Sequence, residues 1–207
     1  MPPRLFVIAA PSGAGKTSLV KALLQRLPDL AVSTSHTTRP ARPNEREGRE
    51  YYFVDNPEFD RLVAAGAFLE HARVFDNQYG TSRRQLEEKL VRGHDVILDI
   101  DWQGARQVRA ALPDCRSIFI LPPSREALRM RLTGRQTDSQ AVIERRLADA
   151  VSDMSHYREF NYVVVNDVFE RAVDQLVEIV RGSAEKYAAG RAELAPILAN
   201  LLGFPAP

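Results

Sequence analysis

The stretch Leu5-Phe6-Val7-Ile8-Ala9-Ala10-Pro11-Ser12-Gly13-Ala14-Gly15-Lys16-Thr17 joins an apolar run to a turn of small residues and a Lys-Thr pair. An apolar strand that stops at such a turn and then opens an amphipathic helix is typical of a phosphate-binding loop. Backbone N–H groups of the turn can surround a polyphosphate, and the helix N-terminus adds partial positive charge. Lys16 can reach the β- and γ-phosphates, and the Thr17 hydroxyl can hold Mg²⁺. The stretch predicts a nucleoside triphosphate site without naming the acceptor.

The loop departs from the usual pattern at its first position, where Ala10 stands in place of glycine. Alanine costs little there if the residue keeps a negative φ, because only a left-handed backbone demands glycine. The alternative is a tight strand-to-helix turn that binds no ligand. Gly-x-Gly-Lys-Thr after a strand is a specific signal, however, and favours the nucleotide site.

The composition of the chain limits the kinds of protein that it can be. The chain has 207 residues, 44% hydrophobic and 27% charged, which suits one sizeable α/β domain with insertions or at most two small domains. Its 28 Lys and Arg balance 27 Asp and Glu, which argues against a general nucleic-acid-binding protein. The single cysteine, Cys115, excludes an internal disulfide and is expected to be buried. No stretch is apolar enough for a membrane span or a signal peptide, so we expect a cytoplasmic protein.

Continuous apolar runs and amphipathic stretches alternate along much of the chain. The apolar runs predict four buried strands, at Leu5–Ala10, Asp95–Asp101, Ser117–Leu121 and Tyr162–Asn166. The amphipathic stretches predict helices at Lys16–Leu27, Gln103–Leu112 and Val168–Tyr187. This order predicts an α/β fold, a doubly wound parallel sheet with right-handed crossovers and helices on both faces.

Two segments interrupt this alternation. Residues 33–92 hold a polar Pro- and Arg-rich loop, partly alternating runs, and helix starts at Asn56-Pro57 and at the capping pattern Ser82-Arg83-Arg84-Gln85. Residues 124–157 are helical and Arg-rich, with a polar turn at Thr133–Ser139. We therefore expect a core, an insertion with a small mixed sheet, a helical lid and a C-terminal helical tail. Their expected bounds are 4–32, 93–123 and 158–184 for the core, 33–92 for the insertion, 124–157 for the lid and 185–207 for the tail.

Two carboxylates end the second predicted strand. Asp99 and Asp101 are two residues apart, so a regular strand would point both toward one face. Ligands of open α/β sheets bind at the carboxyl ends of the strands. One carboxylate could serve Mg²⁺ or its waters and the other the second substrate. The alternative for one of them is to cap the helix that begins near Trp102.

A proline-stiffened loop carries two arginines, Arg39 and Arg42, three residues apart. Proline fixes φ and lowers the entropy lost when the arginines are held in place, and arginine forks bind phosphate bidentately. Tyr51 and Tyr79 could each donate a hydroxyl to a phosphate. The alternative is a solvated basic loop, which is the interpretation we prefer for the charged run of residues 45–50.

Glu70 lies among apolar neighbours, and a carboxylate in a half-buried strand needs a partner. Guanine offers its N1–H and N2–H₂ side by side to a carboxylate, and its O6 then needs a hydroxyl donor such as Ser35 or Thr81. Adenine presents a different edge and would leave Glu70 unpaired. The alternative is a glutamate on the wet face of the small sheet.

Six arginines lie in the segment 124–157, and they are Arg125, Arg129, Arg131, Arg135, Arg145 and Arg146. An arginine delivered to a migrating phosphoryl group stabilises its spread negative charge. A mobile lid that brought Arg135 and Arg146 over the phosphates would also exclude water. For most of the six we prefer a solvated helix with Glu–Arg pairs. The four histidines show no metal-ligand spacing and are interpreted as structural or surface residues.

Taken in order, these motifs resemble those of the guanylate kinase family over nearly the whole chain. Besides the phosphate loop and Ser33–Pro43, the matching blocks are Gly48–Phe53, Phe68-Leu69-Glu70, Tyr79-Gly80-Thr81-Ser82, Leu98–Ala105, Ile118–Ser124, Gly134-Arg135 with Arg146, and Val165-Asn166-Asp167. Bacterial-type members share the alanine that begins the loop. The chain after about residue 185 matches least.

The resemblance implies a P-loop nucleoside monophosphate kinase fold and assigns roles to the candidate residues. Around ATP it places Pro11, Ser12, Gly13, Ala14, Gly15, Lys16, Thr17, Ser18 and Asn166. Around GMP it places Ser35, Arg39, Arg42, Tyr51, Glu70, Tyr79, Gly80, Thr81, Asp99 and Asp101. The catalytic residues it implies are Lys16, Arg39, Arg42, Arg135 and Arg146, with Thr17 on Mg²⁺.

The activity that the resemblance implies is reversible transfer of the ATP γ-phosphoryl group to GMP, giving ADP and GDP, with no nucleic-acid or membrane partner. Self-association through the tail stays open as an alternative to a tail packed on the core. One rival is another small-molecule kinase on the same scaffold, such as a ribose bisphosphate phosphokinase, which Glu70 disfavours. A second rival is a catalytically silent scaffold that binds phosphopeptides, which intact Lys16, Thr17 and the two lid arginines disfavour.

Overall fold

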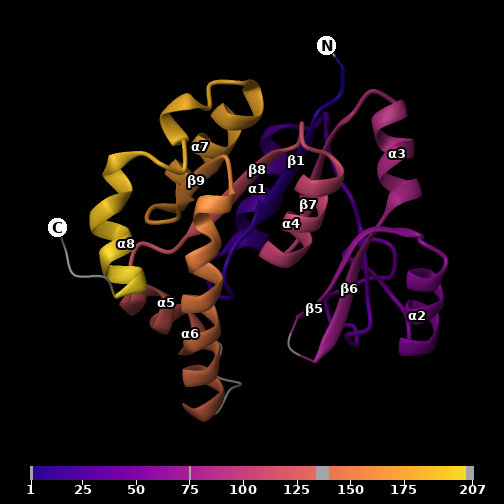
Figure 1. Ribbon diagram of the computed structural model, residues 1–207, viewed down its shortest axis with the longest axis horizontal. Coiled ribbons are helices and arrows are strands. Elements are labelled where there is room, and N and C mark those ends of the chain that lie inside the picture. The colour runs from indigo at the N-terminus through magenta and orange to yellow at the C-terminus, as the bar shows by residue number, and fades with distance from the viewer. Residues whose placement is uncertain (1, 75, 134–139, 204–207) are drawn as a thin grey trace. The chain divides into compact units, whose positions relative to one another are not determined.

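The computed structural model describes residues 2–74, 76–133 and 140–203, and the chain divides into two compact units (Figure 1). The first unit comprises Met1–Val7 and Pro28–Arg116, and the second comprises Ile8–Leu27 and Ser117–Pro207. Strand β1 (Leu5–Ala9) contributes residues to both units and is buried along its whole length.

A parallel sheet has the strand order β2-β7-β1-β8-β9. In the first unit, β2 (Leu30–Val32) pairs in parallel with β7 (Asp95–Asp99). The parallel pair of the second unit is β8 (Arg116–Leu121) and β9 (Tyr162–Val165). Strands that are buried on both faces need continuous apolar runs, which is why the sequence revealed β1, β7, β8 and β9. The predicted parallel α/β sheet is confirmed.

Several helices of the second unit contact one another. They are α1 (Lys16–Arg26), α5 (Arg125–Thr133), α6 (Gln140–Ser155), α7 (Phe169–Arg181) and α8 (Ala195–Leu202), with short 3₁₀ turns η1 (His156–Glu159), η2 (Glu185–Tyr187) and η3 (Ala192–Leu194). Helix α1 packs on α7, and α6 packs on both α5 and α8, as can be followed in Figure 1. The part of the chain described by the structure has no helix long and apolar enough to cross a membrane.

Helix α7 ends earlier than the sequence pattern predicted. It stops at Arg181 because Gly182 takes a left-handed conformation (φ 103°). The N–H of Gly182 donates to the Ile179 carbonyl at 3.2 Å, and the next N–H donates to the Glu178 carbonyl at 2.9 Å. These two bonds close the helix end, so the prediction that the helix reaches Tyr187 is wrong.

The first unit also holds a four-stranded mixed sheet in the order β4-β3-β6-β5. Its strands are β3 (Ser35–Thr37), β4 (Tyr51–Phe53), β5 (Phe68–Val74) and β6 (Asn77–Ser82). Strand β3 is parallel to β4 and antiparallel to β6, and β5 is antiparallel to β6. The predicted small mixed sheet within residues 33–92 is therefore confirmed.

Three helices accompany these strands, and they are α2 (Asn56–Ala64), α3 (Arg83–Val91) and α4 (Trp102–Ala111). The predicted start of α3 is confirmed, because Ser82 Oγ accepts the Gln85 N–H at 3.3 Å. Helix α2 begins in the same way at Asp55, with proline in its first turn. Helices α2 and α4 both contact β5. Cys115 is buried, as expected.

Candidate nucleotide sites

Three polar side chains that were predicted to read a base are buried in the mixed sheet. Glu70 on β5 is only 3% exposed, and Thr81 on β6 and Ser35 on β3 are also buried. Glu70 and Thr81 lie opposite each other in the strand register, and the Thr81 hydroxyl donates to Glu70 Oε1 at 2.6 Å. The alternative of an exposed glutamate on a wet face is therefore wrong. A carboxylate is removed from water only where it has hydrogen-bond donors around it.

A bulge in β5 explains how Glu70 comes to point inward. The register of β5 and β6 shifts between Phe68 and Glu70, and residues 68–70 are buried consecutively. A regular strand would have alternated its exposure, and a bulge re-aims one side chain. The ring of Phe68 packs directly on Gly80, where an added methyl group would lie 3.0 Å from ring carbons. Gly80 therefore lies directly against the Phe68 ring, where a larger residue would not fit.

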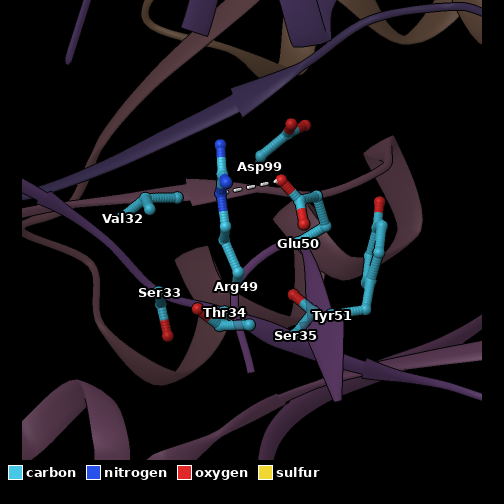
Figure 2. Close-up of a pocket in the computed structure, with 8 residues that line it drawn as sticks. All are labelled: Val32, Ser33, Thr34, Ser35, Arg49, Glu50, Tyr51 and Asp99. Carbon is cyan, nitrogen blue, oxygen red and sulfur yellow. Dashed lines mark ion pairs between the residues drawn. The ribbon is translucent and has the colours of Figure 1, made fainter. Parts of the chain in front are cut away.

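A pocket opens in the first unit and is shown in Figure 2. Its lining residues are Val32, Ser33, Thr34, Ser35, Arg49, Glu50, Tyr51 and Asp99. Asp99 at the end of β7 and the guanidinium of Arg49 lie at the same end of the pocket, where Arg49 Nε pairs with Glu50 Oε1 at 3.1 Å. The sequence assigned Arg49 to a solvated run, and its side chain is indeed 63% exposed while it lines the pocket.

Tyr51 is suited to donate a hydrogen bond from the pocket wall. Burial, reinforced by the negative charge of Asp99, raises the pKa of the Tyr51 hydroxyl to about 12. The hydroxyl therefore keeps its proton at physiological pH. The ring of Tyr79 meets the Tyr51 ring edge-on, with 5.9 Å between ring centres, which fixes both rings.

The arginine loop is held in shape by Glu45. Arg39 Nη2 donates to both carboxylate oxygens of Glu45 at 2.8 and 2.9 Å, and the backbone N–H of Arg42 donates to Glu45 Oε2 at 2.8 Å. The two paired side chains are 15% and 14% exposed, so the interpretation of a solvated run is wrong at Glu45. Arg39 also lies 5.4 Å from the ring centre of Tyr51. Since a guanidinium carries five N–H donors, Arg39 can bind Glu45 and a phosphate together.

The Glu45 pair predicts a pH-dependent contribution to stability. Burial alone would raise the pKa of Glu45, but the hydrogen bonds from Arg39 and Arg42 and the charge of Arg39 lower it. A carboxylate with a lowered folded pKa stabilises the fold above its unfolded pKa of about 4.3, and this stability is lost as the pH falls through the folded pKa. Glu45→Gln should therefore lower the free energy of unfolding at pH 7 by about 1–2 kcal/mol, and by less at pH 3.

Urea unfolding of both proteins at pH 7 and at pH 3 measures this difference. The control is Glu88→Gln, which breaks an exposed pair with Arg84 on α3. Exposed pairs one helical turn apart contribute only about 0.3–0.5 kcal/mol. A Glu45→Gln effect that stayed the same at both pH values would show that the charge of Glu45 plays no part.

The two carboxylates at and just beyond the end of β7 have different surroundings. Asp99 closes the strand and lines the pocket, while Asp101 lies beyond the strand as the N-cap of α4. Asp101 Oδ1 accepts the N–H of Gly104 at 2.7 Å. The capping alternative is thus confirmed for Asp101. The expectation that one regular strand carries both side chains is wrong, because β7 ends at Asp99.

In the second unit, the predicted phosphate loop connects β1 to α1. Gly13 (φ 87°) and Gly15 (φ 92°) take left-handed conformations, which glycine adopts without strain. Gly15 is the N-cap of α1, and no side chain of the described residues caps this end. A helix start leaves N–H groups without intrahelical partners, so those of the first turn are available to an anion. Lys16 and Thr17 are the first two residues of that turn, and Thr17 is exposed.

Two side chains hold the backbone of this loop. Asn166, which follows β9, donates from Nδ2 to the Ala14 carbonyl at 2.7 Å. Arg131 on α5 donates to the same carbonyl at 3.3 Å and to the Asn166 carbonyl at 2.8 Å. A methyl group at Gly15 would lie 2.5 Å from Asn166 Nδ2, so this packing also requires glycine. Nothing in the sequence singles out Arg131 from the other lid arginines, and the proximity of Asn166 to adenine stays a prediction.

The remaining lid arginines differ in their contacts. Arg129 pairs with Glu144 at 2.7 Å in an exposed ion pair, as the interpretation of solvated Glu–Arg pairs predicted. Arg125 instead donates from Nε to the Leu201 carbonyl at 2.7 Å and so ties α5 to the end of α8. Arg146 lies on α6 and is half-buried. Arg135 and most of the predicted polar turn lie outside the described residues.

Metal-binding side chains do not cluster in the part of the chain that the structure describes. No three His, Cys, Asp or Glu residues among those described are placed to hold a metal ion. His36 has a structural role, because its ring stacks on Tyr52 with 4.9 Å between ring centres and meets Phe68 edge-on. Burial lowers the pKa of His36 despite the nearby charge of Glu47.

The second unit holds a phosphate loop between a strand and a helix, and the first unit holds a buried carboxylate and an arginine loop that suit a base and its phosphate. Together these features define a P-loop nucleoside monophosphate kinase. The family model described as guanylate kinase matches residues 2–183. The chain belongs to the guanylate kinase family.

Relatives and solved structures agree with this assignment. The chain is 57% identical to a guanylate kinase of Methylococcus capsulatus over 96% of its own length and 98% of the relative. It is 55% identical to a guanylate kinase of Alkalilimnicola ehrlichii, covering 98% of this chain and all of that one. The crystal structure of guanylate kinase from Anaplasma phagocytophilum is similar with a TM-score of 0.74 at 35% identity, over 95% of this chain and 94% of that one.

Proposed function

We propose that this chain transfers the γ-phosphoryl group of ATP to GMP, reversibly, giving ADP and GDP in purine nucleotide metabolism. The observation that carries the proposal is the buried Glu70 carboxylate with Thr81 on one oxygen, and with Ser35 buried on β3, the strand on the other side of β6. Guanine presents N1–H and N2–H₂ to such a carboxylate. The Thr81 proton is directed at Glu70, so Thr81 can only accept from a base, and Ser35 is the hydroxyl that donates to O6.

The acceptor phosphate would bind at the arginine loop. Arg39, preorganised by Glu45 and by the face of Tyr51, presents its remaining N–H groups, and the more exposed Arg42 lies three residues on. The hydroxyls of Tyr51 and Tyr79 add further hydrogen-bond donors. A phosphate monoester bound by two guanidinium groups loses much of the charge that would repel the donor phosphates.

The donor triphosphate would bind at the loop of the second unit, residues 11–18. The left-handed glycines direct backbone N–H groups to one side, and Lys16 adds a full charge at the α1 N-terminus. The exposed hydroxyl of Thr17 fits Mg²⁺, which keeps several waters and takes few protein ligands beside the phosphates. An ion held there would supply positive charge that neutralises the donor phosphates.

The reaction needs no strong general base, because the attacking phosphate oxygen of GMP is already anionic. Catalysis then consists of aligning two anions, neutralising them and excluding water. Lys16 and the arginines Arg39, Arg42, Arg135 and Arg146 are the proposed cations. Arginines of this kind stabilise the charge spread over the migrating group, each contributing about 10³–10⁵ in rate where they act as fingers.

The test is the rate of ADP formation with ATP, Mg²⁺ and each of GMP, AMP, CMP, UMP and ribose bisphosphate in turn. We expect GMP to be preferred by a factor of about 10⁴ over AMP, because a site built on hydrogen bonds rejects a base that leaves its groups unpaired. Preference for AMP, or for ribose bisphosphate, would replace the proposal with the rival kinase. Tight binding of a phosphopeptide without GMP-dependent ADP formation would favour the silent scaffold.

A further inference from the structure

Gly104 occupies an unexpected position, the third residue of helix α4. Glycine is the poorest helix former apart from proline, and this position in a capped helix commonly carries Glu or Gln. The backbone N–H of Gly104 is already used, since it donates to the N-cap carboxylate of Asp101 at 2.7 Å. The lack of a side chain at Gly104 therefore calls for a packing reason.

The packing reason is Glu70. A methyl group built at Gly104 would overlap Glu70 Oε2 and lie 3.0 Å from Glu70 Cδ. The space that a side chain at 104 would fill is the space that the buried carboxylate occupies. Glu70 is thus held at both oxygens: Thr81 donates to Oε1 at 2.6 Å, and the bare first turn of α4 lies against Oε2. A helix N-terminus also favours a negative charge beside it.

Helix α4 is fastened to β5 next to this contact, so the helix cannot simply move aside. One turn after Gly104, the Gln107 side chain donates to the His71 carbonyl at 2.7 Å and accepts the His71 N–H at 3.2 Å. His71 directly follows Glu70 in β5. A side chain at 104 would therefore displace the flexible end of Glu70 rather than the helix or the strand.

We propose that Gly104 is a positioning residue for base specificity, because its bare Cα sets where Glu70 Oε2 lies. The inference rests on the proposed reading of guanine by Glu70. With Oε2 displaced, the carboxylate can no longer accept N1–H and N2–H₂ of guanine side by side. Inosine monophosphate (IMP) has the same N1–H and lacks only the 2-amino group, so its use depends less on where that oxygen lies.

The experiment compares Gly104→Ala with Gly190→Ala, a control at a glycine that has nothing within 4 Å of an added methyl group. The kcat/KM for GMP and for IMP, the KM for ATP and the melting temperature are measured for each. We expect Gly104→Ala to lower kcat/KM for GMP at least tenfold and the GMP-to-IMP ratio at least threefold. We expect its KM for ATP and its melting temperature to stay close to those of the wild type and of the control.

A second variant tests the steric cause. Glu70→Asp withdraws the carboxylate by one methylene, so in the Gly104→Ala background it relieves the overlap. The loss in the double variant should be smaller than the product of the two single losses. Multiplicative losses, an unchanged GMP-to-IMP ratio in Gly104→Ala, or a Gly104→Ala protein that does not fold would each overturn the inference. Failure of the wild type to phosphorylate GMP would instead overturn the proposed function.

Discussion

Replacing Lys16 with alanine is expected to lower the turnover number for GMP phosphorylation by a factor of about 10²–10³ or more, the range seen when one preorganised charge-stabilising group is removed. Lys16 is the first residue of α1 and directly follows the left-handed Gly15. Its backbone is therefore fixed at the helix end that carries partial positive charge, within reach of the loop. No other group of the loop itself, residues 11–18, can replace a full positive charge on the migrating phosphoryl group.

Lys21→Ala is the matched control, because Lys21 lies on the exposed side of the same helix. It removes an equal charge about one and a half turns farther along α1. We expect its turnover and its melting temperature to stay close to those of the wild type. Steady-state rates with saturating ATP and GMP, checked by far-UV circular dichroism, measure both variants. Full turnover in Lys16→Ala would refute the assigned mechanism.

The parts of the fold that could be predicted are those whose signal is local. The strands β1 and β8 are continuous apolar runs, and the starts of α2 and α3 carry capping residues next to the helix. The phosphate loop is equally local, because its glycines and its Lys-Thr pair are neighbours in the chain. Each of these elements is specified by fewer than twenty consecutive residues.

The elements that escaped prediction depend on partners far along the chain. Strands β2 and β3 have three residues each, too few to show a period, and they exist because β7 and β6 supply their hydrogen bonds. The bulge in β5 that turns Glu70 inward is a property of its pairing with β6. Short strands of this kind are fixed by register, which a single sequence does not display.

The same reason applies to residues of the candidate sites. Arg131 contacts the loop carbonyl of Ala14 across 117 positions of sequence, and Gly104 faces Glu70 from another element. A signal was nevertheless available for Gly104, since glycine in the first turn of a predicted helix is unfavourable without a packing reason. Glu45 lay within a charged run, and in such a run composition alone does not distinguish a buried anchor from solvated neighbours.

Glu70→Gln is expected to lower kcat/KM for GMP by about 10- to 150-fold, the equivalent of the ~1.5–3 kcal/mol assigned to hydrogen bonds with charged groups. Glutamine keeps the shape of the side chain but offers an NH₂ donor where guanine also presents donors. The buried position allows no water to take over, because Glu70 is only 3% exposed. The KM for ATP should not change, since the phosphate loop makes no use of Glu70. Glu87→Gln, on the exposed side of α3, is the control.

Thr81→Val removes the hydroxyl that donates to the Glu70 carboxylate and leaves the carboxylate itself in place. Valine removes the hydroxyl that donates to Oε1 at 2.6 Å while both acceptor oxygens of Glu70 remain. The loss should therefore be smaller, about fivefold, the equivalent of one ordinary hydrogen bond of ~1 kcal/mol. If Thr81→Val instead lost as much as Glu70→Gln, the hydroxyl would be the group that reads the base and the carboxylate its support. The ranking of these two variants, measured as kcat/KM for GMP at constant ATP, therefore decides which atom recognises guanine.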